Sequence, residues 1–132
     1  MNGKKIAYPI ILRKGKSGKM LVYVPDFDGH TEGKDLADAL FMAQDAICML
    51  GVYLQNEKEP IPDPRDINDI ETKDGEIKSL VMVDFDDYRR RTEKRLVKKT
   101  LTIPSWLNLA AEKEGVNFSA TLQEALKAKL GV

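Results

Sequence analysis

Short apolar runs separated by polar turns predict strands at the start of the chain. The runs Tyr8–Leu12 and Met20–Val24 flank a polar turn that contains Gly15 and Gly18. Such an arrangement is typical of a β-hairpin. After a second turn rich in Asp and Gly, His30–Glu32 predicts a brief third strand.

Two further features define the predicted sheet. Pro9 lacks an N–H donor, so we expect the first strand to lie at an edge of the sheet or Pro9 to fall within its first residues. The segment Ile77–Phe85 predicts another strand, and its continuous apolar run Leu80–Val83 favours burial on both faces.

One long amphipathic helix is predicted between these strands. Asp35 is a good N-cap, and Asp38 places a second acid in the first turn. Apolar residues then follow at spacings of three and four: Leu36, Leu40, Ala43, Ile47, Leu50 and Leu54. This stripe predicts a helix that ends near Gln55–Glu57, because Pro60, Pro62 and Pro64 exclude regular structure beyond it.

The stretch Val97–Pro104 has the period of a strand with two different faces. One face carries Val97, Lys99, Leu101 and Ile103, whereas the other carries Lys98, Thr100 and Thr102. Pro104 ends this strand and suits the first turn of a helix.

Two short helices are predicted after this strand. The first is marked by Trp106, Leu107, Ala110 and Ala111 and stops at Gly115; the second begins at Asn117 and carries Leu122, Leu126 and Leu130. The unit 97–132 is too short to bury a stable core alone. We therefore expect two copies to pair their strands in a ribbon-helix-helix arrangement. The expected dimer core is Leu101, Ile103, Leu107, Leu122 and Leu126.

A two-stranded ribbon of this kind fits the major groove of DNA. Lys98, Thr100 and Thr102 are the candidates for reading base edges, and the helix start at Asn117, Phe118 and Ser119 is a candidate phosphate site. A basic connector, 89–96, adds further candidate DNA contacts at Arg89, Arg90, Arg91 and Arg95. A solvent-exposed strand edge and a simple N-cap are the structural alternatives for the first two groups.

Charge is distributed unevenly along the 132 residues. The net charge is zero, but residues 1–87 contain 11 Lys/Arg and 17 Asp/Glu, a balance of −6, and residues 88–132 contain 10 and 4, a balance of +6. This asymmetry indicates two partners of opposite charge. The single Cys48 excludes an intramolecular disulfide, so we expect a cytoplasmic protein, with no membrane partner because no apolar run reaches the length of a span.

The chain resembles a known family in two places. The front, from Tyr8-Pro9 through Val24–Gly33 and the helix to Ala46, is similar to the HicB antitoxin domain; the tail, from Leu101–Leu107 through Asn117–Ser119 to Leu126, resembles ribbon-helix-helix repressors. In that order the two segments resemble a HicB-type antitoxin of HicA/HicB toxin–antitoxin systems. Asp28 and His30 stand where that family commonly has Pro and Cys.

The resemblance implies an α+β protein in two domains and no enzymatic activity. Residues 1–88 would form a partial ribonuclease-H-like domain (β-β-β-α-β) that blocks a small basic HicA ribonuclease toxin, with toxin contacts at Asp26, Phe27, Asp28 and His30. Residues 97–132 would repress the operon by binding operator DNA as a homodimer; a tetramer or larger assembly remains open. No cofactor is implied.

Two other functions are weighed against this interpretation. The first is a ribbon-helix-helix regulator whose front senses a ligand or oligomerises. The second is a metal-dependent nuclease that would use Asp26, Asp28, Asp84, Asp86 and Asp87, with His30 as a general base. These acids form no ordered catalytic set, and no zinc spacing, P-loop or dinucleotide fingerprint is present, so the sequence predicts no metal site.

Overall fold

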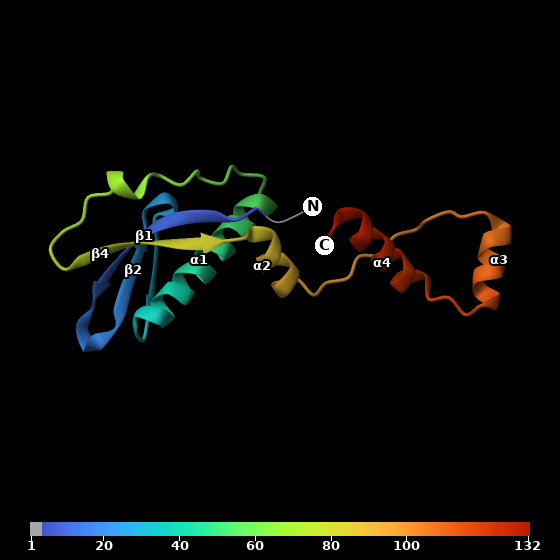
Figure 1. The fold of residues 1–132 in the computed structure, drawn as a ribbon, viewed down its shortest axis with the longest axis horizontal. Coiled ribbons are helices and arrows are strands. Elements are labelled where there is room, and N and C mark those ends of the chain that lie inside the picture. Colours follow the sequence, from blue (N-terminus) through green and yellow to red (C-terminus); the bar gives the residue numbers. More distant parts are fainter. Residues whose placement is uncertain (1–3) are drawn as a thin grey trace. The chain divides into compact units, whose positions relative to one another are not determined.

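The structure, a computed structural model, describes residues 4–132 and divides into two compact units. The first unit ends at Thr92, and the second runs from Glu93 to Val132. Figure 1 shows the mixed α+β architecture, with all four strands in the first unit and helices in both. This boundary assigns three arginines to the front, so its balance becomes 14 Lys/Arg against 17 Asp/Glu.

A four-stranded antiparallel sheet forms the centre of the first unit. The strands are β1 (Ile6–Lys14), β2 (Met20–Val24), β3 (Gly29–Gly33) and β4 (Glu76–Val83), in the spatial order β3-β2-β1-β4. With the helix α1 (Leu36–Asn56) between β3 and β4, the order along the chain is β-β-β-α-β, as the sequence predicts. The hairpin of β1 and β2 is closed by a short 3-10 turn at Lys16–Gly18.

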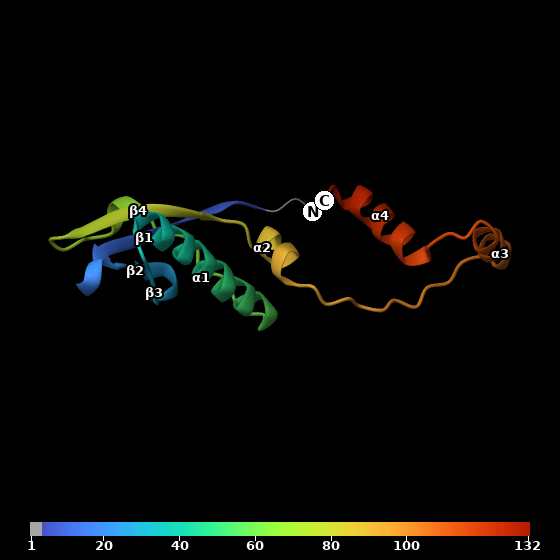
Figure 2. The same cartoon turned by 90° about the horizontal axis from the view of Figure 1, so that it is seen from below.

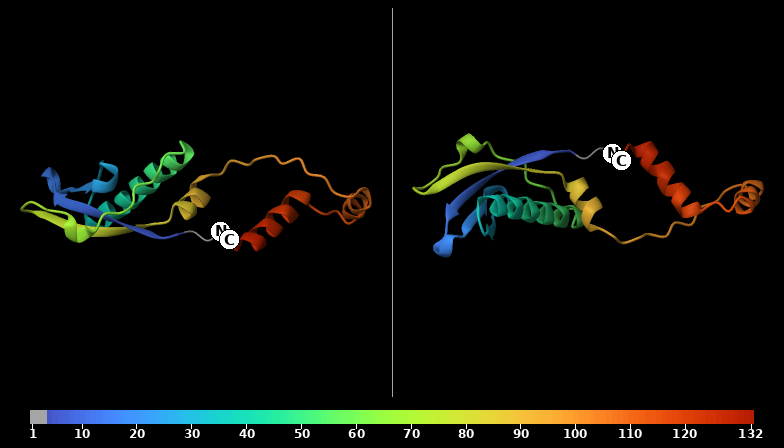
Figure 3. Two further views of the ribbon diagram at one scale, coloured as in Figure 1. Left: turned by 90° about the horizontal axis from the view of Figure 1, so that it is seen from above. Right: turned by 60° about the horizontal axis from the view of Figure 1, so that its bottom comes forward.

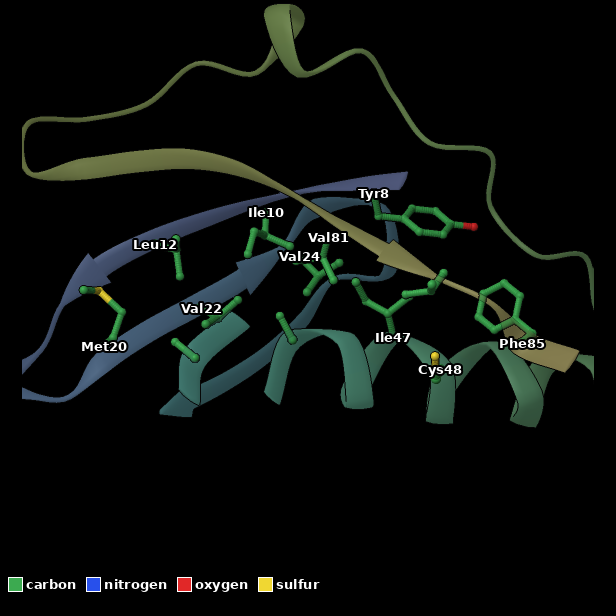
Figure 4. Packing of buried hydrophobic residues seen from close by; sticks show 13 residues of the cluster. Tyr8, Ile10, Leu12, Met20, Val22, Val24, Ile47, Cys48, Val81 and Phe85 are labelled. Carbon is green, nitrogen blue, oxygen red and sulfur yellow. The ribbon is translucent and has the colours of Figure 1, made fainter. Parts of the chain in front are cut away.

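Helix α1 lies against one face of the sheet, and the two bury a single core (Figure 2). Figure 4 shows Ile47 and Cys48 pointing from α1 toward strand residues that include Ile10, Val24 and Val81. Asp35 caps the helix as predicted, because its Oδ1 accepts the Asp38 N–H at 2.8 Å. By length and composition α1 is also the one helix of the described residues that could cross a membrane, but its apolar stripe faces the sheet.

The opposite face of the sheet is only partly covered. The segment from Glu57 to Gly75 crosses it in irregular conformation, with a 3-10 turn at Ile67–Asp69 (Figure 4). The Tyr8 hydroxyl donates to the Pro62 carbonyl at 2.7 Å, and the Lys78 ammonium donates to the Ile67 and Ile70 carbonyls at 3.0 and 3.1 Å. The segment does not cover the whole face, because Leu80 and Met82 of β4 remain exposed.

The structure corrects two predictions about the strands. The first prediction allowed β1 to be an edge strand, and this alternative is wrong because β1 lies between β2 and β4. The ladder with β2 runs only over Ile11–Lys14, so Pro9 has a ladder neighbour on the β4 side alone. The prediction that Leu80–Val83 is buried on both faces is wrong. Val81 and Val83 are buried, but Leu80 and Met82 are 52% and 53% exposed, because nothing in residues 4–132 covers their side of the strand.

The end of β4 is also different from the prediction. The strand stops at Val83, and Phe85 begins a helix, α2 (Phe85–Thr92). Asp84 accounts for this change, because its Oδ1 accepts the Asp87 N–H at 3.0 Å, as an N-cap does. Residues 89–92 of the expected connector therefore belong to a helix that packs on α1 through Phe85.

The second unit contains α3 (Ser105–Lys113) and α4 (Phe118–Leu130), joined by a turn in which Gly115 has φ +67°. Asn117 caps α4 as predicted, since its Oδ1 accepts the Ala120 N–H at 3.0 Å. Residues 93–104 run as an extended segment without a ladder (Figure 3). The strand expected at Val97–Pro104 is thus absent from the single chain, where it has no partner strand.

Candidate functional site

The loop between β2 and β3 contains the four residues that the family resemblance links to the toxin. A 3-10 turn, Pro25–Phe27, is followed by Asp28 in the left-handed conformation, at φ 47° and ψ 42°. Asp tolerates this conformation better than most side chains. Asp26 and Phe27 are partly buried, whereas Asp28 and His30 are exposed.

Two of the four residues are turned inward. The carboxylate of Asp26 is only 4% exposed and receives the Arg65 Nε–H at 2.9 Å, which ties the loop to the segment after α1. The ring of Phe27 lies edge-on to Tyr8, with centroids 5.0 Å apart. These contacts hold the loop in place and leave little of Asp26 for a partner.

The other two residues lie at the surface beside Tyr23. The Tyr23 hydroxyl donates to Asp28 Oδ1 at 3.0 Å, and the rings of Tyr23 and His30 are 4.8 Å apart. The hydrogen bond to the Asp28 carboxylate is the main reason that the pKa of Tyr23 is raised. The sequence did not mark Tyr23, but its position directly opposite His30 in the β2–β3 ladder accounts for the cluster.

Two hollows flank this loop. A groove of about 450 Å³ lies between the loop and the C-terminal half of α1; its lining includes Phe27, Asp28, Leu50, Tyr53 and Pro62. A smaller hollow of about 270 Å³ lies on the open sheet face, where Arg13, Leu21, Tyr23, His30 and Glu76 contribute. Tyr53 is 59% exposed, so the groove presents an aromatic side chain beside an acid.

The acids considered for a nuclease have other roles. Asp26 pairs with Arg65, Asp84 caps α2, and Asp87 receives the Arg91 Nε–H at 2.9 Å. Within the part of the chain that the structure describes, no three His, Cys, Asp or Glu side chains are grouped to hold a metal ion.

The arginines of the predicted connector lie in two different environments. Arg89 donates to the side-chain oxygens of Asn56 and Gln55, at 3.0 and 2.9 Å, so it is anchored to the end of α1. Arg91 pairs with Asp87, which raises its pKa, and lies 5.8 Å from the centre of the Tyr88 ring. Arg90 and Arg95 are exposed.

The tail exposes nearly all of its apolar side chains in the single chain. Neither α3 nor α4 has a buried residue, and the expected dimer-core residues Leu101, Ile103, Leu107 and Leu126 are 61%, 47%, 41% and 49% exposed. Leu122 is partly buried. Lys98, Thr100 and Thr102 are exposed, as are Phe118 and Ser119 at the start of α4.

Comparison with known proteins places this arrangement in a family. A family model described as the HicB-like antitoxin of bacterial toxin–antitoxin systems matches residues 8–126. A search of curated proteins gives no match.

Two solved structures are similar to the chain. One is a toxin–antitoxin complex from Streptococcus pneumoniae, with 27% identity, a TM-score of 0.60, and coverage of 96% of this chain and 99% of that chain. The other is the antitoxin HicB from Burkholderia pseudomallei, with 21% identity, a TM-score of 0.54, and coverage of 96% and 97%. The second likeness concerns the fold alone.

These findings define the class of protein as an antitoxin rather than an enzyme. The chain belongs to the HicB-like antitoxin family of bacterial toxin–antitoxin systems.

Proposed function

We propose that this chain neutralises a small basic HicA-like ribonuclease toxin through its front unit and represses its own operon in the cytoplasm through its tail. The observation that carries the proposal is the contrast between the two units. The front buries a complete core, whereas the tail exposes the apolar side chains of the segment before α3 and of two helices. Such a tail needs a second copy, and the polar residues of the two copies then form one surface that fits the major groove of DNA.

The dimer follows from the energetics of the tail. An exposed segment of 40 residues cannot offset its ordering entropy without burying more apolar surface. If two copies of 97–103 pair antiparallel, Leu101 and Ile103 face the four helices while Thr100 and Thr102 face outward. The extended conformation of this segment in the single chain is compatible with such pairing.

Operator binding uses the outward face of this ribbon. Lys98, Thr100 and Thr102 supply a cation and two hydroxyls at alternate positions, and the free N–H groups at the start of α4 suit a phosphate. Residues 93–132 contain 7 Lys/Arg against 4 Asp/Glu, so the unit attracts a polyanion. Arg90 and Arg95 add phosphate contacts, whereas Arg89 is held by α1.

Toxin binding uses the surface beside the β2–β3 loop. Asp28 lies between the groove that contains Tyr53 and the hollow that contains Tyr23 and His30. Exposed aromatic side chains next to an acid suit a basic protein partner, because Tyr supplies buried area and the acid supplies charge complementarity. The similar structure from Streptococcus pneumoniae is a toxin–antitoxin complex, which supports a toxin partner for this chain.

Separate variants test the two activities. Asp28→Lys is expected to lower the affinity for the toxin at least tenfold and to leave operator binding unchanged. Asp74→Lys is the matched control, because Asp74 is exposed in the turn before β4 and changes the charge equally. Toxin affinity is measured by calorimetry and neutralisation by growth after toxin induction. Equal losses in both variants would reject the loop as the toxin site.

A further inference from the structure

The turn between β1 and β2 is a basic segment on a front unit that is acidic elsewhere. Residues 13–19, here called the hairpin tip, contain four Lys/Arg and no Asp/Glu. The rest of the front unit contains 10 Lys/Arg against 17 Asp/Glu. All four cationic side chains of the hairpin tip are exposed: Arg13, Lys14, Lys16 and Lys19. Such a local excess of positive charge indicates a polyanionic partner.

The acids of the neighbouring strands do not neutralise the hairpin tip. Lys19 forms a surface ion pair with Glu32, and its Nζ lies 3.6 Å from the carboxylate. Glu76, at the start of β4, accepts the Lys73 N–H through its Oε1 at 2.7 Å. Three cations of the hairpin tip form no ion pair within residues 4–132: Arg13, Lys14 and Lys16.

The start of α1 lies at the same end of the sheet, because Gly33 at the end of β3 pairs with Met20 at the start of β2. Its two acids accept backbone N–H groups at 2.8 Å, Asp35 from Asp38 and Asp38 from Lys34. The positive end of the helix dipole offsets their charge. Lys34 is itself exposed and adds a further cation. These acids therefore serve the helix and leave the charge of the hairpin tip in place.

The backbone of the hairpin tip is a tight turn. The Gly15 N–H donates to the Lys19 carbonyl at 2.7 Å, and a 3-10 turn at Lys16–Gly18 lies between them. Figure 1 shows the hairpin tip (blue) at the end of the sheet far from α2. The cations therefore lie at one extremity of the front unit.

The hairpin tip and the proposed toxin surface lie at opposite ends of β2. Met20 begins the strand after the hairpin tip, and Val24 ends it before the loop that contains Asp28. A basic toxin is attracted to the acidic end and repelled by the hairpin tip. The polyanion proposed above for this chain is operator DNA, so DNA is the partner that fits the basic end.

We propose that the hairpin tip binds phosphates of the duplex DNA that flanks the operator, while the tail of the same chain holds the operator itself. This inference rests on the operator binding proposed above. Contacts between lysine and phosphate carry no sequence information, so the added affinity is independent of the flanking sequence. The tail keeps DNA at a high effective concentration near the front unit, so weak phosphate contacts are sufficient.

Chain lengths limit where the hairpin tip can meet DNA. Residues 93–96 link the front unit to the ribbon expected from residue 97, and four extended residues span at most about 14 Å. β1 begins beside the end of β4 that leads to α2, and its nine residues extend about 30 Å to the hairpin tip. The two lengths together reach about 45 Å, which is about 13 base pairs at a spacing of about 3.4 Å.

The test measures how operator affinity depends on salt, with two DNA probes and the full-length chain. One probe ends at the palindrome located by footprinting upstream of the chain's own operon. The other carries in addition about 20 base pairs of random sequence on each side, which exceeds the reach of about 13 base pairs. Affinity is measured by fluorescence anisotropy, and the salt slope is the slope of log affinity against log salt concentration.

The wild type is expected to have a steeper salt slope on the flanked probe than on the palindrome alone. Lys16→Gln should lower the slope on the flanked probe by at least about 0.9, the value for one phosphate contact, and Lys14→Gln/Lys16→Gln should lower it further. Neither variant should change the slope on the palindrome alone. Lys16→Arg keeps the charge and should keep the wild-type slope on both probes.

Lys58→Gln is the matched control for charge. Lys58 is an exposed lysine just beyond the C-terminal end of α1, outside the hairpin tip, so its loss should leave both slopes unchanged. Circular dichroism verifies that each variant is folded. Calorimetry with the toxin should give wild-type affinity for the hairpin-tip variants, because the acidic end of the front unit is intact.

Three results would overturn the proposal while operator binding by the tail stands. They are equal wild-type slopes on the two probes, a wild-type slope for Lys14→Gln/Lys16→Gln on the flanked probe, and equal losses for Lys16→Gln and Lys58→Gln. A wild type that does not distinguish the palindrome from random DNA would reject the proposed operator function and this inference with it. If the hairpin-tip variants lost affinity for a single-stranded RNA but not for the flanked probe, the hairpin tip would bind RNA and the assignment to DNA would be wrong.

Discussion

Gly51 and Phe85 form the contact that fixes α2 against α1, and the substitution Gly51→Ala tests it. Gly51 is buried in the third quarter of α1, and a Cβ at this position would overlap the edge of the Phe85 ring. Phe85 is itself only 5% exposed, so its ring has little room to move. The contact matters for function because α2 carries Arg90 and leads to the tail.

Two effects of opposite sign determine how much Gly51→Ala changes the free energy of unfolding. Replacement of a helical Gly by Ala favours the helix by about 1 kcal/mol. Overpacking a rigid core costs about 1–3 kcal/mol, and complete expulsion of the ring would approach the roughly 3–5 kcal/mol of a Phe→Ala substitution. The difference leaves a net loss of up to about 2 kcal/mol in the free energy of unfolding for Gly51→Ala. For a unit of this size the melting temperature falls by about 4–8 °C per kcal/mol.

The assay can follow the front unit alone. All four tyrosines lie in the front and the single tryptophan, Trp106, lies in the tail, so near-ultraviolet circular dichroism of tyrosine reports the front in a urea titration. The control is the same substitution in a Phe85→Ala background, where the clash is absent and Ala at position 51 is expected to stabilise. A stabilising effect of Gly51→Ala in the wild-type background would refute the packing argument.

Three further predictions concern other contacts. Tyr8→Phe removes the hydrogen bond to the Pro62 carbonyl and is expected to cost about 1 kcal/mol. Burial raises the pKa of Tyr8 to about 12, above the value near 10 of the unfolded chain. The wild type should therefore lose stability as pH rises from 10 to 12, and Tyr8→Phe should lose less. Urea titrations at each pH measure this difference. Asp26→Asn weakens the ion pair with Arg65, so hydrogen exchange in residues 57–75 should accelerate; unchanged rates would argue against the tether. In operator titrations at several salt concentrations, Arg90→Ala should reduce the salt slope by about 0.9. Thr100→Ala should keep the slope and reduce discrimination between operator and random DNA. Discrimination equal to that of the wild type would show that Thr100 does not read bases.

The sequence by itself determined the features that depend on local periodicity and local hydrogen bonds. The apolar stripe of α1, its cap at Asp35 and the cap of α4 at Asn117 are set by residues within a few positions of each other. The hairpin of β1 and β2 also follows from two short runs and the turn between them. The tail's need for a partner stays a prediction from the sequence, which rests on a unit too short to have enough apolar surface for a core of its own.

Only the tertiary structure decided which apolar and acidic side chains are covered. Leu80 and Val81 look alike in sequence, but α1 covers one face of β4 and the crossing segment stops short of the other. Asp26 and Asp28 stand two residues apart in one loop, yet Arg65 encloses the first, and the left-handed turn leaves the second at the surface. Phe85 begins a helix because Asp84 caps it and Gly51, distant in sequence, leaves space for its ring. The coverage of Val81 by α1, the pairing of Asp26 with Arg65 and the packing of Phe85 on Gly51 all depend on contacts between segments far apart in the chain, which periodicity cannot predict.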